Sequence, residues 1–388
     1  MIKRFAAELV EESKVLAAAV AVLAVSNTVN TEYFATFDKT NSELTKTSGA
    51  YAVTPQQNTV IYINKTGNKV GSDILRRNNI NMYRQTCTNL LEQPPEKVKE
   101  WLNGFDAVIT DCDGVLWVYS NVIEGAVDAM NRFKTIGKKI FFCTNNSTKT
   151  RQQLLEKSHS MGFDITAEGM ISSAHSTAAY LKARNFQKKV YVIGAGGITG
   201  ELDAVGIKHS EIGPDVMTST LADYLATSFR KDPEIGAVVV GFDEHFSFCK
   251  MIKAASYLDN PECLFIATNT DERFPMPGMV IPGSGSFVRA VQTCAEREPF
   301  VIGKPNPSIC EWLINEGTID PARTLMIGDR CNTDILLGYN CGFQTLLVGT
   351  GIHKLNDVEA WKNSDDPEQK KLIPDVFLPK LGDLLPFM

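Results

Sequence analysis

The stretch from Phe105 to Trp117 reads Phe-Asp-Ala-Val-Ile-Thr-Asp-Cys-Asp-Gly-Val-Leu-Trp. Its short apolar run, Ala107 to Ile109, is typical of a strand buried on both faces of a parallel sheet. Asp111 and Asp113 follow that run, and the next residue is a glycine that lets the chain turn sharply. Because ligands of open α/β sheets bind at the carboxyl ends of the strands, we expect both acids in one site.

The two acids have two possible roles. Close carboxylates repel each other unless a cation or a shared proton lies between them. A hard divalent metal would remove that repulsion and would suit phosphoryl chemistry. The alternative is an ordinary strand that ends in an Asx-rich turn, since Asp and Gly are common turn residues. A calcium-binding loop is excluded because its later ligands do not follow at the required spacing.

The composition is that of a globular protein large enough for two domains. The chain has 388 residues, of which 44% are hydrophobic and 22% charged, as in ordinary soluble domains. The net charge of −6 and the lack of a basic stripe argue against a nucleic-acid partner. The nine cysteines are scattered without zinc-like pairing, which indicates reduced thiols. We therefore expect a cytoplasmic protein that does not contact a membrane.

The first hundred residues differ from the remainder of the chain. An apolar run from Val15 to Val25 resembles the central part of a signal peptide, but it is too short to span a bilayer. An amphipathic helix or a leader without fixed structure agrees better with the reduced cysteines downstream. Residues 26–69 are rich in Thr, Asn, Ser and Gln and have little to bury. We expect residues 1–100 to be a poorly ordered extension outside the catalytic unit.

From Phe105 onward, apolar strand-like runs alternate with helical stretches, which predicts an α/β architecture with mostly parallel sheets. Helices are expected at residues 125–137, 150–161 and 175–183. Strands are expected at residues 107–109, 139–143, 190–193, 237–240, 264–267, 300–302, 324–327 and 345–348, with another near Ile171.

Polar residues follow three more of these strands. Thr144 and Asn145 can face an anion with a hydroxyl, an amide and backbone N–H groups, or can form a turn that caps the next helix. Lys304 lies in a loop stiffened by two prolines, although a lone lysine is usually just solvated. A helix cap would explain either Asp329 or Asp334, but less readily both. Each feature alone is weak evidence for a functional site. Four strand ends of acidic, hydroxyl, basic and acidic character, in that order, are much stronger evidence for one.

This order of motifs resembles that of the haloacid dehalogenase-like (HAD) phosphatase superfamily. The residues of these motifs are similar to those in the branch that contains eukaryotic 4-nitrophenyl phosphatase, phosphoglycolate phosphatase and pyridoxal phosphatase. The resemblance implies a doubly wound parallel-sheet core at residues 101–187 and 299–388, with an α/β cap inserted at residues 188–298. It also suggests a homodimer formed through the cap. The matching motifs are residues 111–117, 144–147, 240–243 and 328–330.

The resemblance further implies a phosphatase of small phosphate monoesters. Asp111 would attack phosphorus and form an aspartyl-phosphate intermediate, and Asp113 would protonate the leaving oxygen. Thr144, Asn145 and Lys304 would hold the phosphoryl oxygens and neutralise charge in the transition state.

The same resemblance implies Mg²⁺ as the cofactor. The ion would be held by Asp111, the backbone carbonyl of Asp113, and Asp329. Asp334 would orient these ligands from outside the coordination sphere.

Substrate choice is expected to lie in the cap, because the core motifs handle only the phosphate. In the family loop that Ala267 to Pro275 resembles, the pyridoxal phosphatase branch carries His at the position of Phe274, and the phosphoglycolate branch an apolar residue. Arg273 either meets a substrate carboxylate or forms a surface ion pair. We therefore expect 2-phosphoglycolate as the favoured substrate, with pyridoxal 5′-phosphate as the alternative.

Two other classes of protein are weaker hypotheses. A binding or scaffold protein without turnover does not explain the intact catalytic acids and lysine. A nucleotide-dependent oxidoreductase rests only on Gly194-Ala-Gly-Gly-Ile-Thr-Gly200, whose third glycine is one position late for a dinucleotide motif. We expect a glycine-rich turn there.

Overall fold

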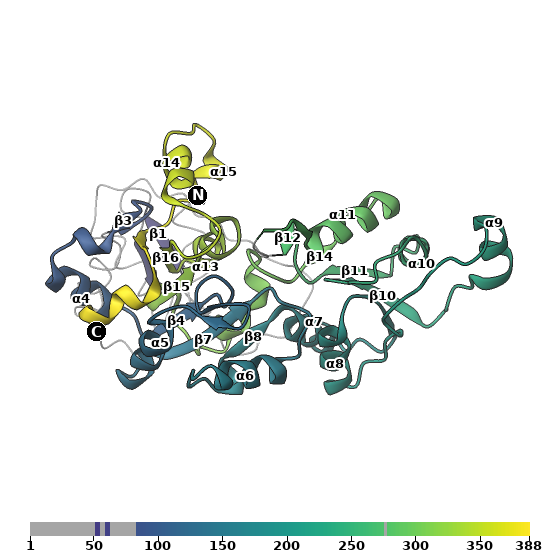
Figure 1. Ribbon diagram of the computed structural model, residues 1–388, viewed down its shortest axis with the longest axis horizontal. Coiled ribbons are helices and arrows are strands. Elements are labelled where there is room, and N and C mark those ends of the chain that lie inside the picture. Colours follow the sequence, from purple (N-terminus) through teal and green to yellow (C-terminus); the bar gives the residue numbers. More distant parts are fainter. Residues whose placement is uncertain (1–50, 55–58, 63–82, 275–277) are drawn as a thin grey trace, which may run out of the picture. The chain divides into compact units, whose positions relative to one another are not determined.

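The computed structural model describes residues 51–54, 59–62, 83–274 and 278–388 (Figure 1). The chain divides into two units, residues 1–72 and 73–388. The described part of the first unit is an antiparallel pair of strands, β1 (Tyr51–Thr54) and β2 (Thr59–Tyr62). The predictions for the apolar run at 15–25 and for most of the polar stretch at 26–69 lie outside the described residues.

The second unit contains a parallel sheet of seven strands, and we call this sheet with its helices the core (Figure 1). Its central strand β4 (Ala107–Thr110) pairs with β15 (Thr324–Gly328) on one side and β7 (Lys139–Thr144) on the other. The order β3-β17-β16-β15-β4-β7-β8 is completed by β3 (Thr88–Asn89), β17 (Val376–Leu378), β16 (Gln344–Val348) and β8 (Met170–Ser172). The predicted strands at 107–109, 139–143, 324–327 and 345–348 are confirmed.

Helices surround this sheet, and they begin where the sequence provides caps. The clearest example is α6 (Arg151–Ser160), where Thr150 and Gln153 form a reciprocal capping box that satisfies two N-terminal donors. The remaining helices around this sheet are α4 (Pro95–Asn103), α5 (Ala126–Thr135), α12 (Glu311–Asn315), α13 (Leu336–Cys341), α14 (Leu355–Lys362) and α15 (Pro367–Lys370). The helix α7 (Ser173–Ala183) follows β8, but its buried Ala174, Ala178 and Leu181 pack in one apolar cluster with Val190 of the second sheet.

Both faces of the core sheet are covered. Val108 of β4 packs in one apolar cluster with Met130 and Phe133 of α5, whereas Ile109 packs in a second cluster with Leu337 of α13. Successive side chains of a strand point to opposite faces, so the two clusters lie on opposite sides of the sheet. The predicted doubly wound parallel sheet is confirmed.

A second parallel sheet is inserted after α7, and we call the chain from β9 to β14 the cap. Its strand order is β14-β11-β10-β9, formed by β9 (Lys189–Ile193), β10 (Ile235–Val240), β11 (Leu264–Ala267) and β14 (Phe300–Val301). Two short strands, β12 (Arg273–Phe274) and β13 (Ile281–Pro282), form a separate antiparallel pair. The helices are α8 (Gly196–Ala204), α9 (Leu221–Asp223), α10 (Phe248–Leu258) and α11 (Ser284–Ala295).

The predicted domain boundaries are wrong at two places. Residues 83–100 belong to the core: β3 pairs with β17, and Leu90 and Val98 are fully buried in the core cluster. Phe300–Val301 was assigned to the core, but it pairs with β11, and Ile302 packs in a cap cluster with Val190. In both cases a two-residue strand pairs with a partner that its own sequence does not identify.

The glycine-rich stretch after β9 leads directly into α8, and its glycines serve close packing. A Cβ on Gly197 would meet the backbone oxygen of Ser147 and the backbone nitrogen of Lys149, each at 2.5 Å. The first turn of α8 therefore rests on the loop after β7. The predicted glycine-rich turn over residues 194–200 is wrong for most of its length, because Gly196 to Gly200 form the start of this helix. No helix in the described ranges has the length and apolar character needed to cross a membrane.

Candidate active site

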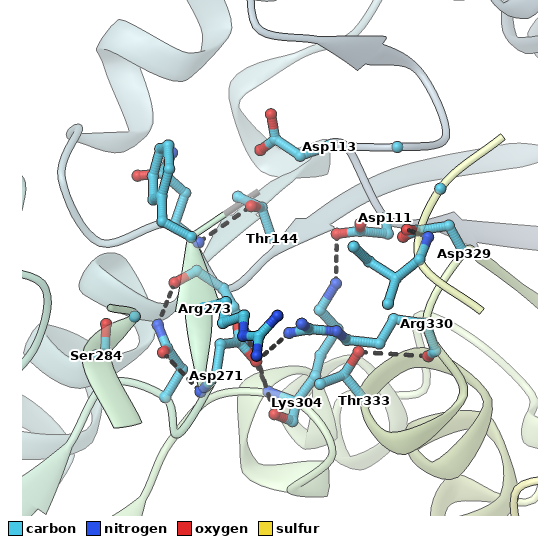
Figure 2. Close-up of a pocket in the computed structure, with 18 of the residues that line it drawn as sticks. Asp111, Asp113, Thr144, Asp271, Arg273, Ser284, Lys304, Asp329, Arg330 and Thr333 are labelled. Carbon is cyan, nitrogen blue, oxygen red and sulfur yellow. Dashed lines mark hydrogen bonds and ion pairs between the residues drawn. The ribbon is translucent and has the colours of Figure 1, made fainter. Parts of the chain in front are cut away.

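One pocket collects residues from the carboxyl ends of β4, β7 and β15 and from the cap (Figure 2). Such convergence follows from the parallel sheet, in which these strand ends share one edge. Asp334 is buried beside the pocket, in a π-helical turn over Cys331–Ile335. The other predicted site residues all line the pocket: Asp111, Asp113, Thr144, Asn145, Phe274, Lys304 and Asp329.

Lys304 lies between two buried acids. Its ammonium forms ion pairs with Asp111 and, at 2.8 Å, with Oδ1 of Asp334, and it donates to the carbonyl of Cys143 at 2.9 Å. Figure 2 shows the side chain directed at Asp111. Burial alone would lower the pKa of Lys304, but the carboxylates of Asp111 and Asp334 raise it well above its usual value. Lys304 is therefore a fixed positive charge at the base of the pocket.

The carboxylates of Asp111, Asp329 and Asp334 form a cluster, with one oxygen of each lying within 4.8 Å of the others. Burial raises the pKa of Asp111 well above its ordinary value, and Lys304 only partly offsets this. Burial and the carboxylate of Asp334 raise the pKa of Asp329 to about 7. When all three acids are ionised, they carry more negative charge than one lysine offsets, so a hard divalent cation fits this donor set.

The side chain of Asp113 lies outside that carboxylate cluster, and its predicted part in metal binding through the backbone carbonyl stays a prediction. Its Oδ1 accepts a hydrogen bond from Nε1 of Trp117 at 3.0 Å, and the ammonium of Lys157 lies 4.4 Å from the centre of the Trp117 ring. Burial raises the pKa of Asp113, against the opposing effects of Lys157 and Trp117. A carboxyl group with a raised pKa suits a general acid.

Asn145 holds the loop that carries Lys304. Its Oδ1 accepts from the backbone N–H of Lys304 at 2.8 Å, and its Nδ2 donates to the carbonyl of the same residue at 3.1 Å. The amide also reaches Asp271 of the cap, at 3.3 Å. These contacts give Asn145 a positioning role, while its predicted contact with phosphate stays a prediction. Thr144 is buried, and its hydroxyl accepts from the N–H of Asn146 at 3.1 Å.

The loop after β16 contributes to the site and was missed in the sequence. The N–H of Ile352 donates to Oδ2 of Asp329 at 2.8 Å, and Oγ1 of Thr350 donates to the carbonyl of Gly114 at 2.5 Å. A Cβ on Gly351 would lie 1.8 Å from Oδ2 of Asp329, so only glycine permits this approach. The indication was available: Gly349-Thr-Gly directly follows a predicted strand.

The cap contributes the opposite wall of the pocket. Asp271 forms an ion pair with Nη1 of Arg330 at 3.3 Å, which links the cap loop to the core. Phe274 is half-buried in the pocket wall, with its ring 5.3 Å from that of Phe242. Arg273 lines the pocket with an exposed side chain. The Asp271–Arg330 pair was not predicted, because its two members are distant in the sequence.

Comparison with known proteins gives a consistent set of relatives. Two family models match, one described as haloacid dehalogenase-like hydrolase over residues 108–208 and one as HAD-hydrolase-like over residues 301–379. Glycerol-3-phosphate phosphatase of Mus musculus is 40% identical over 301 residues, which are 75% of this chain and 93% of the relative. Chronophin of Homo sapiens is 36% identical, over 74% of this chain and 94% of its own.

A plant protein and a solved structure extend this set. Phosphoglycolate phosphatase 1A, chloroplastic, of Arabidopsis thaliana is 35% identical over 80% of this chain and 86% of its own. The structure of p-nitrophenyl phosphatase from Archaeoglobus fulgidus superposes with a TM-score of 0.61 at 27% identity, and the match covers 73% of this chain and 99% of that one.

Proposed function

Since this chain belongs to the haloacid dehalogenase-like hydrolase family, we propose that it is a Mg²⁺-dependent phosphatase that hydrolyses small phosphate monoesters through an aspartyl-phosphate on Asp111. The observation that carries the proposal is the position of Lys304, buried between Asp111 and Asp334. An anionic nucleophile can approach an anionic phosphate only where positive charge compensates both. The buried ammonium, beside an acid cluster that fits a divalent cation, meets that requirement.

In the proposed reaction Asp111 attacks phosphorus, and the bond from phosphorus to the ester oxygen breaks. Asp113 gives its proton to that leaving oxygen and then takes one from the water that hydrolyses the acyl phosphate. The raised pKa of Asp113 supports the first of these tasks, because it increases the protonated fraction. Lys304 would hold phosphoryl oxygens throughout, together with Thr144.

Mg²⁺ would be held by carboxylate oxygens of Asp111 and Asp329 and by the carbonyl of Asp113, with Asp334 orienting the group. When bound, the ion supplies charge neutralisation for the phosphoryl oxygens and the nucleophile. The N–H of Ile352 donates a hydrogen bond to Oδ2 of Asp329 and so orients this carboxylate, which supports its role as a metal ligand.

We further propose 2-phosphoglycolate as the favoured substrate. Phe274 places an apolar ring in the cap wall of the pocket, and such a ring cannot hydrogen-bond to a pyridine substituent. Pyridoxal 5′-phosphate is the alternative, because the rings of Phe242 and Phe274 both line the pocket and could pack against an aromatic leaving group. The names of the relatives, which include a phosphoglycolate phosphatase, support a small metabolite.

A homodimer formed through the cap and a cytoplasmic location belong to the same proposal. The exposed apolar side chains of Val216, Leu225 and Phe248 in the cap support a contact surface there. All nine cysteines are free, which supports a reducing compartment.

The test is a phosphate-release assay with purified protein across 4-nitrophenyl phosphate, 2-phosphoglycolate, glycerol 3-phosphate and pyridoxal 5′-phosphate. We expect hydrolysis that a chelator abolishes and added Mg²⁺ restores, with the highest kcat/KM for 2-phosphoglycolate. Release of phosphate from none of these esters in the presence of Mg²⁺ would overturn the proposed phosphatase. Turnover that survives chelation would overturn the role of the metal alone.

A further inference from the structure

Arg273 is a cation in the wall of the pocket. No ion pair of Arg273 is found within residues 83–274 and 278–388, although its side chain lines the pocket. The nearest acid in the sequence that also lines the pocket, Asp271, is already paired with Arg330 at 3.3 Å. Glu272 is exposed and is not part of the pocket wall. The guanidinium is therefore available to an anion that enters the pocket.

The N-terminus of α11 lies in the same wall, at Gly283 and Ser284 (Figure 2). Gly283, the N-cap, offers no side chain to the free N–H groups of the first turn. Ser284 is only 4% exposed, and in the described part of the chain neither its hydroxyl nor its N–H has a hydrogen-bond partner. Because Ser284 lines the pocket, its hydroxyl and N–H are open to a ligand that binds there. At this position the helix dipole favours an anionic ligand.

Arg273 and Ser284 are held next to each other by the backbone. Arg273 in β12 pairs with Pro282 in β13, two residues before Ser284. The N–H groups of Gly283 and Gly285 donate to the carbonyls of Glu272 and Asp271, both at 2.9 Å. A Cβ on Gly283 would lie 2.2 Å from the carbonyl oxygen of Asp271, so the helix start can approach this loop only with glycine there. These contacts hold the backbone of Arg273 and of Ser284 in place.

We propose that Arg273, Ser284 and the N-terminus of α11 form a second anion subsite that binds a carboxylate on the leaving group of the phosphate ester. The substrates are then small phosphate monoesters that carry a carboxylate, and esters of neutral alcohols such as glycerol are disfavoured. This inference rests on the proposed phosphatase function and names the residues that discriminate among phosphate esters. A planar guanidinium and a helix N-terminus bind a carboxylate more strongly than a hydroxyl, because the hydrogen bonds are charge-assisted.

The core wall of the pocket supplies no competing site for that carboxylate. Lys304 is assigned to the phosphoryl oxygens, and Arg330 is paired with Asp271. The core acids Asp113 and Asp329 would repel a second anion. Of the cations that line the pocket, Arg273 is the one for which the described residues supply no ion pair.

The experiment compares two esters that differ only in the group in question: 2-phosphoglycolate, with a carboxylate, and 2-hydroxyethyl phosphate, with an alcohol. The variants are Arg273→Gln and Ser284→Ala, with Arg289→Gln as the matched control, since Arg289 is exposed on α11 and lies outside the pocket. For Arg273→Gln we expect the ratio of kcat/KM values, carboxylate ester over alcohol ester, to fall about tenfold or more, mainly through KM. Ser284→Ala should lower the ratio several-fold, and the control should keep it.

Direct binding separates this inference from the function on which it rests. Calorimetry of 2-phosphoglycolate with the Asp111→Asn protein, with and without Arg273→Gln, measures the subsite without turnover. A weaker Kd on loss of Arg273 supports the subsite. An unchanged Kd and an unchanged kcat/KM ratio overturn it even if the wild type is an active phosphatase. If the wild type hydrolyses no ester, the proposed function fails, and the binding comparison alone decides on the subsite.

Discussion

The two walls of the pocket differ in how their charges are arranged. On the core wall, Lys304, Asp111, Asp329 and Asp334 are all buried. Lys304 forms ion pairs with Asp111 and Asp334, and one oxygen of each of the three acids lies within 4.8 Å of the others. On the cap wall, Arg273 is exposed and without a partner in the described residues, and Phe274 is half-buried against another ring.

This difference separates two tasks. Buried paired charges cost little reorganisation when the phosphate arrives, so the core wall is suited to the chemical step that every substrate shares. Groups that lack a protein partner gain their contacts only from the ligand, so the cap wall is suited to discrimination among leaving groups. Substitutions on the core wall should therefore affect all substrates, and those on the cap wall should change their ranking.

The largest effect is expected for the proposed nucleophile. Asp111→Asn keeps the shape of the side chain but removes the anion that attacks phosphorus. The kcat for 4-nitrophenyl phosphate and for 2-phosphoglycolate should both fall by at least about a thousandfold. Steady-state kinetics on both substrates measures this.

The matched control is Asp366→Asn, because Asp366 is an exposed acid far along the chain, at the start of α15. It should retain wild-type turnover. If Asp111→Asn kept substantial activity in a preparation free of contaminating phosphatase, the assignment of the chemistry to the core wall would be wrong.

The core wall also depends on an edge of the sheet that the sequence did not reveal. A chain beginning at Pro94 lacks β3 and Leu90, and it leaves the buried Asp375 without Arg84 and the N–H of Gln85. Relative to a chain beginning at Asp73, we expect a loss of about 3 kcal/mol or more in the free energy of unfolding. Chemical denaturation of both chains measures the difference. Equal free energies of unfolding would show that residues 83–93 do not stabilise the core.

This boundary shows why part of the fold was not predictable. Apolar runs such as Leu264–Ala267 identify buried strands because a parallel sheet requires near-continuous apolar residues. β3 has only Thr88 and Asn89, without any pattern, and its partner β17 lies almost three hundred residues away. Phe300–Val301 was predicted as a strand, but the local sequence does not show which of the two sheets this strand joins. Pairing between distant segments is decided by tertiary packing.

The site was predictable to the extent that it follows strand ends. Asp111, Thr144, Lys304 and Asp329 come together because the sheet is parallel, and the sequence shows the strands that precede them. The positioning role of Asn145 could not be predicted from the strand ends, because its amide is hydrogen-bonded to the backbone of Lys304, 159 residues further on. Contacts of this kind depend on loop conformation rather than on residue type.

A smaller effect is expected for the acid on the core wall. Lys157, above the Trp117 ring, lowers the pKa of Asp113 against the raising effect of burial. Lys157→Gln should therefore move that pKa upward. Since Asp113 must be protonated to assist the leaving oxygen, the alkaline limb of the kcat profile for 2-phosphoglycolate should shift to higher pH.

The pH profile for 4-nitrophenyl phosphate should shift less, because nitrophenolate leaves without a proton. Lys182→Gln, at an exposed position of α7, serves as the charge-matched control and should leave both profiles in place. An alkaline limb that stays fixed or moves to lower pH in Lys157→Gln would remove Asp113 from the role of general acid.

The smallest effect is expected on the cap wall, at Phe274. The ring lines the pocket and also contacts Phe242, so it either faces the leaving group or serves as packing. In Phe274→His, the imidazole can donate to or accept from a pyridine substituent, which the phenyl ring cannot do. One added hydrogen bond is worth about 1 kcal/mol, which changes a kcat/KM ratio several-fold. The ratio for pyridoxal 5′-phosphate over 2-phosphoglycolate should rise by that factor, while 4-nitrophenyl phosphate changes less. If the ratio stays constant while the melting temperature falls, Phe274 is a packing residue, and discrimination on the cap wall must rest on other side chains.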